Sequence, residues 1–381
     1  MNDLSRETVA TLLQAEGAEP KITIYAPMHT PASPPHMTEN QIRFKNLMHQ
    51  AADQLKAQGD KHMAQILYEQ VERHMLDLAF WESQTEGLLI CADPEQIQYF
   101  HLPIDTDEYV AIDNCYHLAP VLALLGDEQS FYVLAIAQHQ PKLFSGSLYG
   151  LYEMEAGLPE NLEDSLRLDE MGQQREQSQA KGSNVSFNGR GGRRDPREEE
   201  RLRFFRLIDS AVMQATERGL PLILAGTDSE IAEYRAISKH PDIMDRTITG
   251  SFTGAKPHEL YRQAYAIIYN GPVAARREQA LQSYASLKGS SKERVTEDPL
   301  AIAEAAEQGR IDTLLIALKR TTADTVRDTA RAVERITFPH RELSTLVNSA
   351  ANAVANARGR IVNIDEEAAP GTASVMALLR Y

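Results

Sequence analysis

The chain has 381 residues and a formal net charge of −15, with 43% hydrophobic and 24% charged residues. This length suits two or three domains, and the composition is that of a folded globular protein. The negative charge argues against a general nucleic-acid-binding protein, so any contact with RNA must come from a local basic patch.

Cysteines and motifs narrow the class of protein further. Cys91 and Cys115 are the only cysteines, which argues against a disulfide framework or a thiolate zinc site and favours the cytoplasm. The N-terminal sequence lacks the basic start and apolar run of a signal peptide, and no apolar run is long enough to span a membrane. No histidine metal motif, P-loop or GxGxxG is present, so we expect no metal and no cofactor.

The N-terminal block mixes helices and strands and is predicted to form a domain over residues 1–127. Expected helices cover 5–15, a long segment from 38, and 61–79; expected strands cover 22–25, 87–91 and 97–102. The continuous apolar run GLLIC predicts a buried strand, paired with 97–102. We expect Trp81 in the core, and Asp105, Asp107 and Glu108 in a solvated turn rather than a cation site.

The middle block alternates strands with helices, which predicts an α/β domain over residues 128–272. Its expected strands cover 130–138, 141–148, 219–226 and 247–252, and its helices cover 197–217, 228–238 and 257–268. The strand GLPLILAG has the apolar run of a buried parallel strand. Residues 158–188 are polar and poor in apolar side chains, so we expect them to be mobile.

The last block, residues 273–381, is expected to form an α/β/α sandwich. Its expected helices cover 273–287, 299–308, 325–335 and 339–357, and its strands cover 311–318, 360–365 and 374–381. Gly309 follows the second of these helices, in the position where a left-handed residue commonly ends a helix.

A glycine–arginine loop before the helix of 197–217 is the best candidate site. Glycines allow close backbone approach, and forked guanidinium groups suit phosphate, so this loop is predicted to contact nucleic acid. The predicted contact residues are Gly189, Arg190, Gly191, Gly192, Arg193, Arg194, Arg197 and Arg201. The alternative is a surface loop whose arginines pair with the acidic residues at 198–200. Asp195 and Pro196 have the order of an N-cap and a first helical residue.

Asp209 lies within the apolar face of the same predicted helix. It could act as an acid or base, although a single carboxylate on a helix is more often a surface residue. The residues alone therefore predict a cytoplasmic three-domain α/β protein with one anion-seeking loop.

At residues 189–192, GRGG, the chain resembles the archaeo-eukaryotic class of peptide-chain release factors and the ribosome-rescue factor pelota. It resembles family 3 of their bacterial relatives most closely. The family's loop reads GRGGQ and precedes an arginine-rich helix; here GRGGR precedes RLRFFRLIDSAV. Further similar segments are KITIYAP, PLILAG with DSEIAEY, ITGSFTGAKPHELYRQA, EDPLAIAEAAEQGRIDTLLIA and the terminal ALLRY. The resemblance implies three α/β domains, of which the middle one is RNase H-like.

The chain departs from release factors at the residues that carry out termination. The family's loop glutamine positions water against the peptidyl-tRNA ester, and Arg193 takes its place here. A guanidinium donates hydrogen bonds but cannot accept them, so we do not expect the family's hydrolysis. The stop-codon motifs NIKS and YxCxxxF are replaced by NQIRFKN and VAIDNCY.

The resemblance therefore implies a ribosome-associated factor that binds the A site without reading stop codons. Its implied partners are the ribosome, tRNA and, through the C-terminal domain, a translational GTPase; we expect no DNA and no membrane partner. Two alternatives stay open. The protein could hydrolyse a peptidyl-tRNA ester with its GRGGR loop, or it could be a non-ribosomal interaction protein that reuses the fold.

Overall fold

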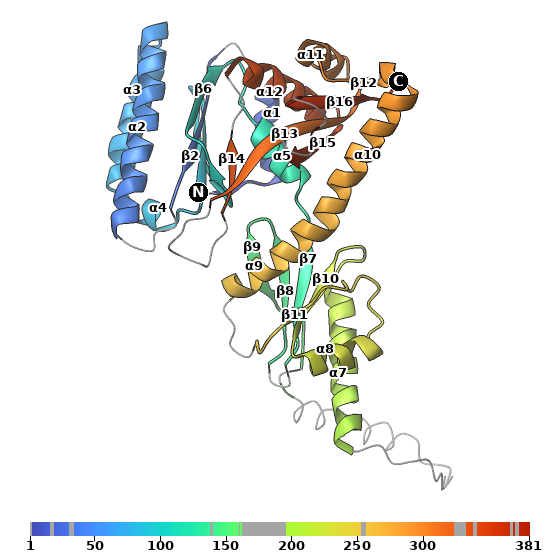
Figure 1. Ribbon diagram of the computed structural model, residues 1–381. Helices are drawn as coiled ribbons and strands as arrows, with labels where there is room; N and C mark the ends of the chain where they lie inside the picture. The colour runs from blue at the N-terminus through green and yellow to red at the C-terminus, as the bar shows by residue number, and fades with distance from the viewer. Residues whose placement is uncertain are drawn as a thin grey trace, which may run out of the picture. The chain divides into compact units, whose positions relative to one another are not determined.

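The computed structural model describes residues 2–15, 19–29, 34–137, 140–159, 161, 196–252, 257–323, 333–337, 341–365, 369 and 373–381. These residues form two compact units. One is built from Met1–Glu128 together with Ala274–Tyr381, and the other from Gln129–Val273. Both units combine helices and strands (Figure 1), which confirms the predicted α/β class.

The first unit contains an N-terminal five-stranded sheet with the order β1-β4-β3-β2-β6. Its neighbours are antiparallel except for β1 and β4, which are parallel. The strands are β1 (Asn2–Asp3), β2 (Lys21–Pro27), β3 (Gly87–Ala92), β4 (Ile97–Leu102) and β6 (Tyr109–Asp113). The predicted pairing of 87–91 with 97–102 is confirmed, because β3 and β4 pair along their whole length.

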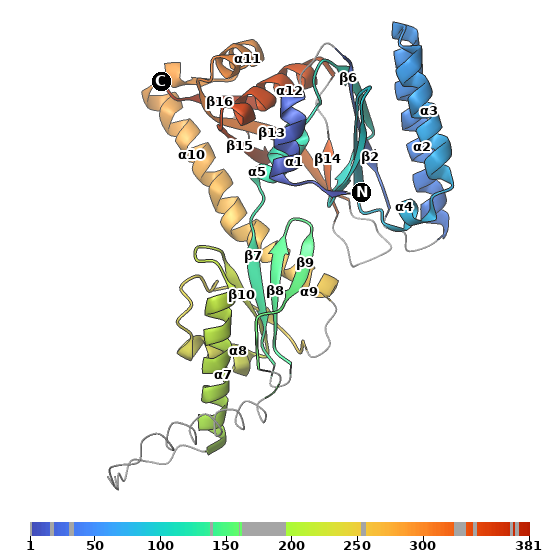
Figure 2. The same ribbon diagram turned by 180° about the vertical axis from the view of Figure 1, so that it is seen from behind.

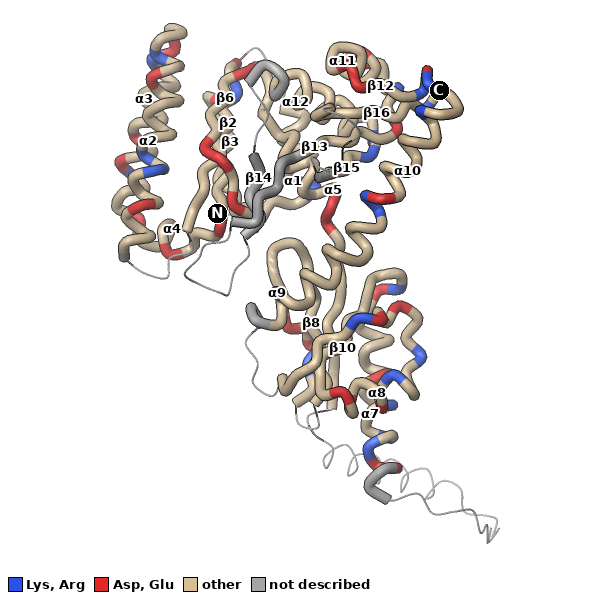
Figure 3. The backbone as a smooth tube through the Cα atoms, in the orientation of Figure 1, with Lys and Arg blue, Asp and Glu red and all other residues tan. Residues whose placement is uncertain are grey.

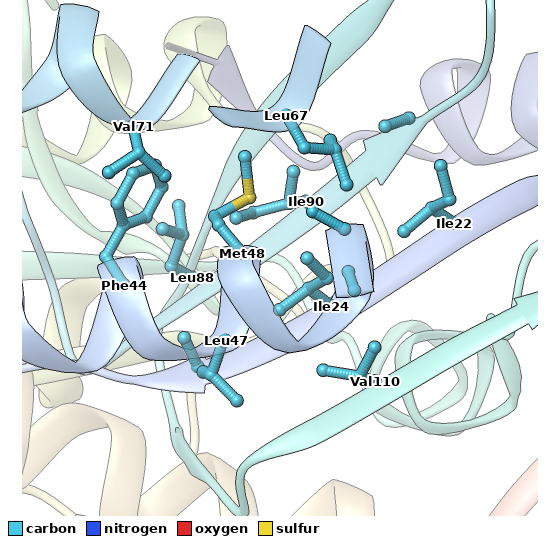
Figure 4. Packing of buried hydrophobic residues seen from close by; sticks show 14 of the residues in the cluster. Ile22, Ile24, Phe44, Leu47, Met48, Leu67, Val71, Leu88, Ile90 and Val110 are labelled. Carbon is cyan, nitrogen blue, oxygen red and sulfur yellow. The ribbon is translucent and has the colours of Figure 1, made fainter. Parts of the chain in front are cut away.

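Three helices cover one face of this sheet: α2 (Pro34–Gln58), α3 (Lys61–Met75) and α4 (Leu78–Glu82). Alternate residues of β2, among them Ile22 and Ile24, point into the core because side chains alternate along a strand. They meet Phe44 of α2 and Leu67 of α3, as Figure 4 shows. The predicted strand 22–25 is thus confirmed and lies at the centre of a packed layer.

The helix predicted over 61–79 is interrupted after Met75. Asp77 caps the separate helix α4, since its Oδ1 accepts a hydrogen bond from the Phe80 backbone N–H at 3.1 Å. The interruption places Trp81 in the core, where its Nε1 donates to the His74 carbonyl oxygen at 2.6 Å. The expected core position of Trp81 is confirmed, with a side chain only 1% exposed.

The first unit also contains a C-terminal sheet, centred on β13 (Ile311–Ala323). It runs parallel to β15 (Arg360–Asp365) and antiparallel to β16 (Val375–Leu379), which in turn pairs with β12 (Val295–Thr296). Helix α10 (Ala274–Ser290) packs on one face. Helices α11 (Pro299–Glu307) and α12 (Arg341–Asn356) pack on the other, and α5 (Ala119–Gly126) packs against α12 and β15. The predicted C-terminal α/β/α sandwich is confirmed.

Helix α1 (Arg6–Gln14) lies beside α12, as Figure 2 shows from behind. The segment before α5 is joined to α12 by hydrogen bonds. Asn348 accepts from the backbone N–H groups of Leu118 and Ala119 through Oδ1, at 2.6 and 3.1 Å, and donates to the Tyr116 carbonyl at 3.0 Å. Residues from both ends of the chain therefore share one folded unit.

Two expectations for this unit are wrong. The helix predicted over 325–335 is wrong for its described residues, 333–335. They belong to strand β14 (Val333–Thr337), which runs antiparallel to the end of β13. Pairing with β13 overrides the local helical preference. Asp105, expected in a solvated turn, lies in β5 (Asp105–Thr106), which pairs with β14 in parallel.

The second unit is a sheet with the order β11-β10-β7-β8-β9. Strands β7 (Phe131–Ala135), β8 (Lys142–Ser147) and β9 (Gly150–Met154) are antiparallel neighbours. Strands β10 (Leu222–Gly226) and β11 (Ile248–Thr249) continue the sheet in parallel with β7. In chain order this is the 3-2-1-4-5 arrangement of RNase H-like sheets, as predicted for the middle domain. The sequence did not predict β9.

Helices cover both faces of this second sheet. Helices α7 (Pro196–Ala215) and α8 (Asp228–Ile237) pack on one face of the sheet and form a hydrophobic core with it. Helix α9 (Pro257–Ile268) packs on the other face and forms a second core. A π-helical turn, Tyr269–Val273, joins α9 to α10 near residues 271–272, where a domain boundary is expected from the sequence. A π turn admits Pro272 because its hydrogen-bond pattern is wider than that of an α-helix.

Candidate nucleic-acid interface

Helix α7 positions the end of the predicted glycine–arginine loop. Four residues of its apolar stripe, Phe204, Phe205, Ile208 and Val212, are at most 2% exposed and pack in the core shared with the sheet and α8. Because this stripe fixes the rotation of the helix, Arg203 and Arg206 are left on its exposed face. Figure 3 shows Lys and Arg recurring along the described part of this helix.

The structure describes only part of the predicted interface. Gly189, Arg190, Gly191, Gly192, Arg193 and Arg194 lie outside the described residues, as do residues 160 and 162–188 of the segment 158–188 that is expected to be mobile. Pro196 is the first helical residue, as predicted, and Arg197 lies in the first turn. Their contact with nucleic acid stays a prediction.

Arg201 is the one predicted contact residue whose side chain is described. Its Nε lies 3.5 Å from the Glu233 Oε2 of α8, and its side chain is 39% exposed. The pair joins the two helices on this face of the sheet. A phosphate approaching Arg201 would have to compete with a carboxylate, so Arg201 is poorly placed as the primary phosphate contact.

Asp209 is buried, not a surface residue, with only 7% of its area exposed. Its carboxylate accepts hydrogen bonds from the Tyr234 hydroxyl at 3.0 Å, from the Lys239 backbone N–H at 3.1 Å and from the Ser238 hydroxyl. Burial and the nearby carboxylate raise the pKa of Tyr234 well above its ordinary value. With these partners Asp209 ties α7 to the end of α8, which argues against an acid–base role.

His240 holds the end of α7 in a similar way. Its Nδ1 accepts from the Asp242 backbone N–H at 3.2 Å, which leaves Nε2 as the donor to the Thr216 hydroxyl at 3.0 Å. Thr216 in turn donates to the Val212 carbonyl at 2.7 Å. Burial lowers the pKa of His240, consistent with this neutral form. Sequence reasoning missed this anchor because the residues are joined by the fold.

The start of α8 is already occupied by acidic side chains. Thr227 and Glu230 form a capping box, in which the Glu230 carboxylate accepts from the Thr227 backbone N–H at 3.1 Å. Asp228 also lies in this first turn. A helix N-terminus with its own carboxylates is a poor anion site, so this end of α8 offers no second phosphate position.

The described residues contain no group of three or more His, Cys, Asp or Glu side chains that could hold a metal ion. None of the described helices is both long enough and apolar enough to cross a membrane. For binding an anion, the described part of this face therefore offers the exposed arginines of a firmly packed helix.

Comparison with solved structures finds several archaeal and yeast proteins of low sequence identity. Solved structures with a similar fold include the archaeal translation termination factor aRF1, at 11% identity, covering 98% of this chain and 96% of that one, with a TM-score of 0.23. Pelota of Archaeoglobus fulgidus is 14% identical over 77% of this chain and 79% of its own, with a TM-score of 0.33. Dom34 of S. cerevisiae is 10% identical over 68% and 64%, with a TM-score of 0.31. A search of curated proteins finds no significant match.

The match to a family model is more specific and includes the glycine–arginine loop, α7 and all five strands of the second sheet. It covers residues 130–310 and is described as bacterial archaeo-eukaryotic release factor family 3. The resemblance predicted from the sequence is confirmed: residues 130–310 of this chain match the model of bacterial archaeo-eukaryotic release factor family 3.

Proposed function

We propose that this protein is a ribosome-associated translation factor, related to release and rescue factors, that binds the ribosomal A site without reading stop codons. The observation that carries the proposal is the family match over residues 130–310, which contains the arginine-rich loop and α7. We keep the three-domain division at 1–127, 128–272 and 273–381 as part of the proposal.

The middle domain supports binding to RNA through a firmly held helix. Phe205, Ile208 and Val212 fix α7 on its sheet, and Asp209 and His240 anchor its second half. The loop that precedes the helix combines three glycines with Arg190, Arg193 and Arg194. Arginine in such a setting binds phosphate bidentately, and this binding weakens as salt rises.

We infer binding rather than hydrolysis because Arg193 stands where release factors carry glutamine. An amide both donates and accepts hydrogen bonds and can hold a water molecule, whereas a guanidinium only donates. The proposed partners follow the family resemblance: ribosome and tRNA for the loop, and a translational GTPase for the C-terminal domain. A solved structure of archaeal Pelota is described as ribosome-bound with ABCE1, and Dom34 as interacting with Hbs1.

Sedimentation through sucrose gradients tests the proposal, in growing cells and in cells with antibiotic-stalled ribosomes. We expect the wild-type protein to move with ribosomes at low salt and the Arg190→Ala, Arg193→Ala, Arg194→Ala triple variant to stay at the top. A matched control removes three exposed arginines of the same unit, Arg218, Arg246 and Arg262. The control variant should sediment as the wild type does.

The same gradient distinguishes the alternatives. A protein that stays off ribosomes under every condition is not a ribosomal factor, and the reuse of the fold for another partner would replace our proposal. If the protein binds, a peptidyl-tRNA release assay on programmed ribosomes follows. Release above the buffer rate by the wild type would contradict the binding-only role, and the Arg193→Gln variant shows whether the loop can support hydrolysis.

A further inference from the structure

Five arginines lie at one end of the C-terminal sheet. Strands β13 and β15 are parallel and begin at this end, whereas β16 is antiparallel to β13 and ends here. Helix α12 ends just before β15, and β12 begins beside the end of β16. The arginines next to these strand and helix ends are Arg294, Arg310, Arg358, Arg360 and Arg380. The fold thus brings together residues that are far apart in the chain, and we call them the C-terminal arginine cluster.

Backbone carbonyl groups hold part of this cluster in place. Arg294 Nη2 donates to the carbonyl oxygens of Leu379 and Arg380, both at 3.1 Å. Arg380 Nη2 donates to the Ala357 carbonyl at 3.0 Å, and the Arg380 backbone N–H donates to the Arg310 carbonyl at 2.8 Å. A guanidinium group has five N–H donors, and a neutral carbonyl group does not cancel its charge. These contacts therefore position Arg294 and Arg380 and leave both side chains positively charged.

The cluster carries an excess of positive charge. Among the described residues, its one ion-paired carboxylate is Asp312, whose Oδ2 accepts a hydrogen bond from Arg360 Nη2 at 2.9 Å. This hydrogen bond lowers the pKa of Asp312, and the charges of Arg360 and Arg380 act in the same direction. Glu293 and Glu307 are exposed nearby in the chain, but neither forms an ion pair with the described part of the cluster. Five guanidinium groups are thus balanced by one carboxylate, in a chain whose net charge is −15.

Arg358 has a backbone conformation that favours glycine. Its φ angle is 56°, in the left-handed region, and it lies just after the end of α12. Helices commonly end on a left-handed glycine at this position, yet here the glycine, Gly359, comes one residue later. A cation near a helix C-terminus gains from the helix dipole, but an arginine in the last turn would have the same gain without a left-handed residue. The position of Arg358 therefore points to a use for its guanidinium group.

The chemistry of the cluster and of its surroundings favours RNA as the ligand. A guanidinium group binds a phosphate through two parallel hydrogen bonds, and clustered cations supply most of the affinity for a nucleic acid. Three of the five arginines are exposed, and Figure 3 shows Lys and Arg near the end of β16. The exposed neighbours Gln308 and Asn356 are polar, and the Tyr381 ring lies 5.8 Å from the Arg310 guanidinium carbon. The described residues here thus offer little of the apolar core on which a protein interface is built.

We propose that the C-terminal arginine cluster binds the phosphate backbone of base-paired RNA, with Arg310, Arg358 and Arg380 as the phosphate-binding residues. Arg294 holds the end of β16, and Arg360 is already paired with Asp312. The cluster belongs to the first unit and shares no residue with the glycine–arginine loop of the second. The inference is therefore independent of the role proposed for that loop, and each can be tested without the other.

Binding of a labelled RNA hairpin to the full-length protein, followed by fluorescence anisotropy at several salt concentrations, tests this inference. Each phosphate contact adds about one to the slope of log affinity against log salt concentration. The double variant Arg310→Gln, Arg358→Gly should lower the magnitude of this slope by about two and weaken binding at least about tenfold in about 100 mM KCl. Arg358→Gly alone should weaken binding and yet raise the midpoint of urea unfolding, since glycine adopts a left-handed conformation without strain. A structural role for Arg358 predicts the opposite change in stability.

Two further variants provide the comparison. Lys45→Gln, Lys56→Gln removes two exposed cations from α2 of the same unit and should keep the wild-type slope. The loop variant Arg190→Ala, Arg193→Ala, Arg194→Ala is measured alone and together with the cluster substitutions. If loop and cluster bind RNA independently, their losses in slope add in the combined variant. A loss confined to the loop variant would leave the proposed function intact and would exclude the cluster as an RNA site.

Three other results would overturn the inference. One is a wild-type protein that does not bind the hairpin even at low salt. Another is an equal loss of slope in the lysine variant, because the effect would then be one of net charge. The third is a polyglutamate peptide of the same charge that binds more tightly than the hairpin and depends equally on Arg310 and Arg358. That result would make the cluster a surface for an acidic protein.

Discussion

The Arg277 guanidinium binds the Asp127 carboxylate through two nitrogen atoms, with Nε 3.2 Å from Oδ1 and Nη2 2.6 Å from Oδ2. Both side chains are buried, and Asn363 donates to the same carboxylate at 3.4 Å. Asp127 lies next to the end of the first segment of its unit, and Arg277 lies near the start of the second. The pair therefore joins two segments about 150 residues apart in the chain.

Removing one member of this pair should destabilise the first unit strongly. Arg277→Ala leaves a buried carboxylate without its counter-charge, a change that costs about 3–5 kcal/mol in other proteins. Urea unfolding can be followed by the fluorescence of Trp81, the single tryptophan of the chain, which lies in this unit. Arg360→Ala is the matched control, because its ion pair with Asp312 is exposed and should be worth at most about 1 kcal/mol. Equal losses in both variants would contradict the prediction.

Gly126 should tolerate no side chain. A Cβ atom added there would lie 2.1 Å from the Ile361 carbonyl oxygen, which belongs to the backbone of β15 and cannot move aside easily. Gly126→Ala should therefore cost at least about 2 kcal/mol in the same unfolding experiment. Gly289→Ala in α10 meets no atom within 4 Å and should stabilise the protein by up to about 1 kcal/mol, as alanine favours helices. A Gly126→Ala variant as stable as the wild type would show that β15 is not this close.

Elements with strong local signals could be predicted from the sequence. The apolar runs of β3 and β10 and the helix of α9 have the expected positions because each carries its own pattern of side chains. Strand β14 could not be predicted, since its segment is extended only through its pairing with β13. Likewise, the bonds of Asn348 to residues 116–119 depend on a fold that brings together segments about 230 residues apart.

The candidate interface was predictable only in part. The arginine-rich loop and α7 are visible in the sequence because glycines, arginines and an apolar stripe follow one another. The ion pair of Arg201 with Glu233 crosses between two helices and leaves no local pattern. The sequence does show that Asp209 is a carboxylate inside an apolar stripe. Only its hydrogen bonds with Tyr234 and Lys239 show that it anchors α7 to the end of α8.

Asp209 should contribute more to the stability of the second unit than the partly exposed Glu233 does. Asp209→Ala leaves the Tyr234 hydroxyl and the Lys239 N–H without their partner, which should cost about 2–3 kcal/mol. Glu233→Ala removes a partly exposed ion pair and an exposed hydrogen bond from the Ser229 hydroxyl, and should cost at most about 1 kcal/mol. Amide hydrogen exchange in α7 and α8 measures both effects within this unit. The prediction fails if Asp209→Ala leaves the exchange of these helices unchanged.

Acid should destabilise the second unit through His240. Burial lowers the pKa of this imidazole in the folded protein, and the smaller effects of Asp242 and Asp209 oppose that change without cancelling it. The unfolded chain, with an ordinary histidine pKa of about 6.5, therefore binds a proton that the folded unit resists. By linkage, stability is complete above about pH 6.5 and falls as the pH drops through the unfolded pKa toward the folded one, by at most about 1.4 kcal/mol per pH unit.

The His240→Gln variant isolates this effect, because glutamine can accept from Asp242 N–H and donate to Thr216 but does not titrate. The measurement is hydrogen exchange of the β10 amides between pH 7.5 and 5.5, corrected for intrinsic exchange rates. It reports opening of the second unit alone. This matters because burial also lowers the pKa of His74 in the first unit, which would add its own acid sensitivity to a measurement on the whole protein. We expect a smaller loss of protection at low pH in His240→Gln than in the wild type. His62→Gln, at an exposed position, serves as the control and should follow the wild-type profile. If His240→Gln loses protection as steeply as the wild type does, the acid sensitivity arises elsewhere, and the hydrogen bonds of His240 hold α7 without any consequence for pH.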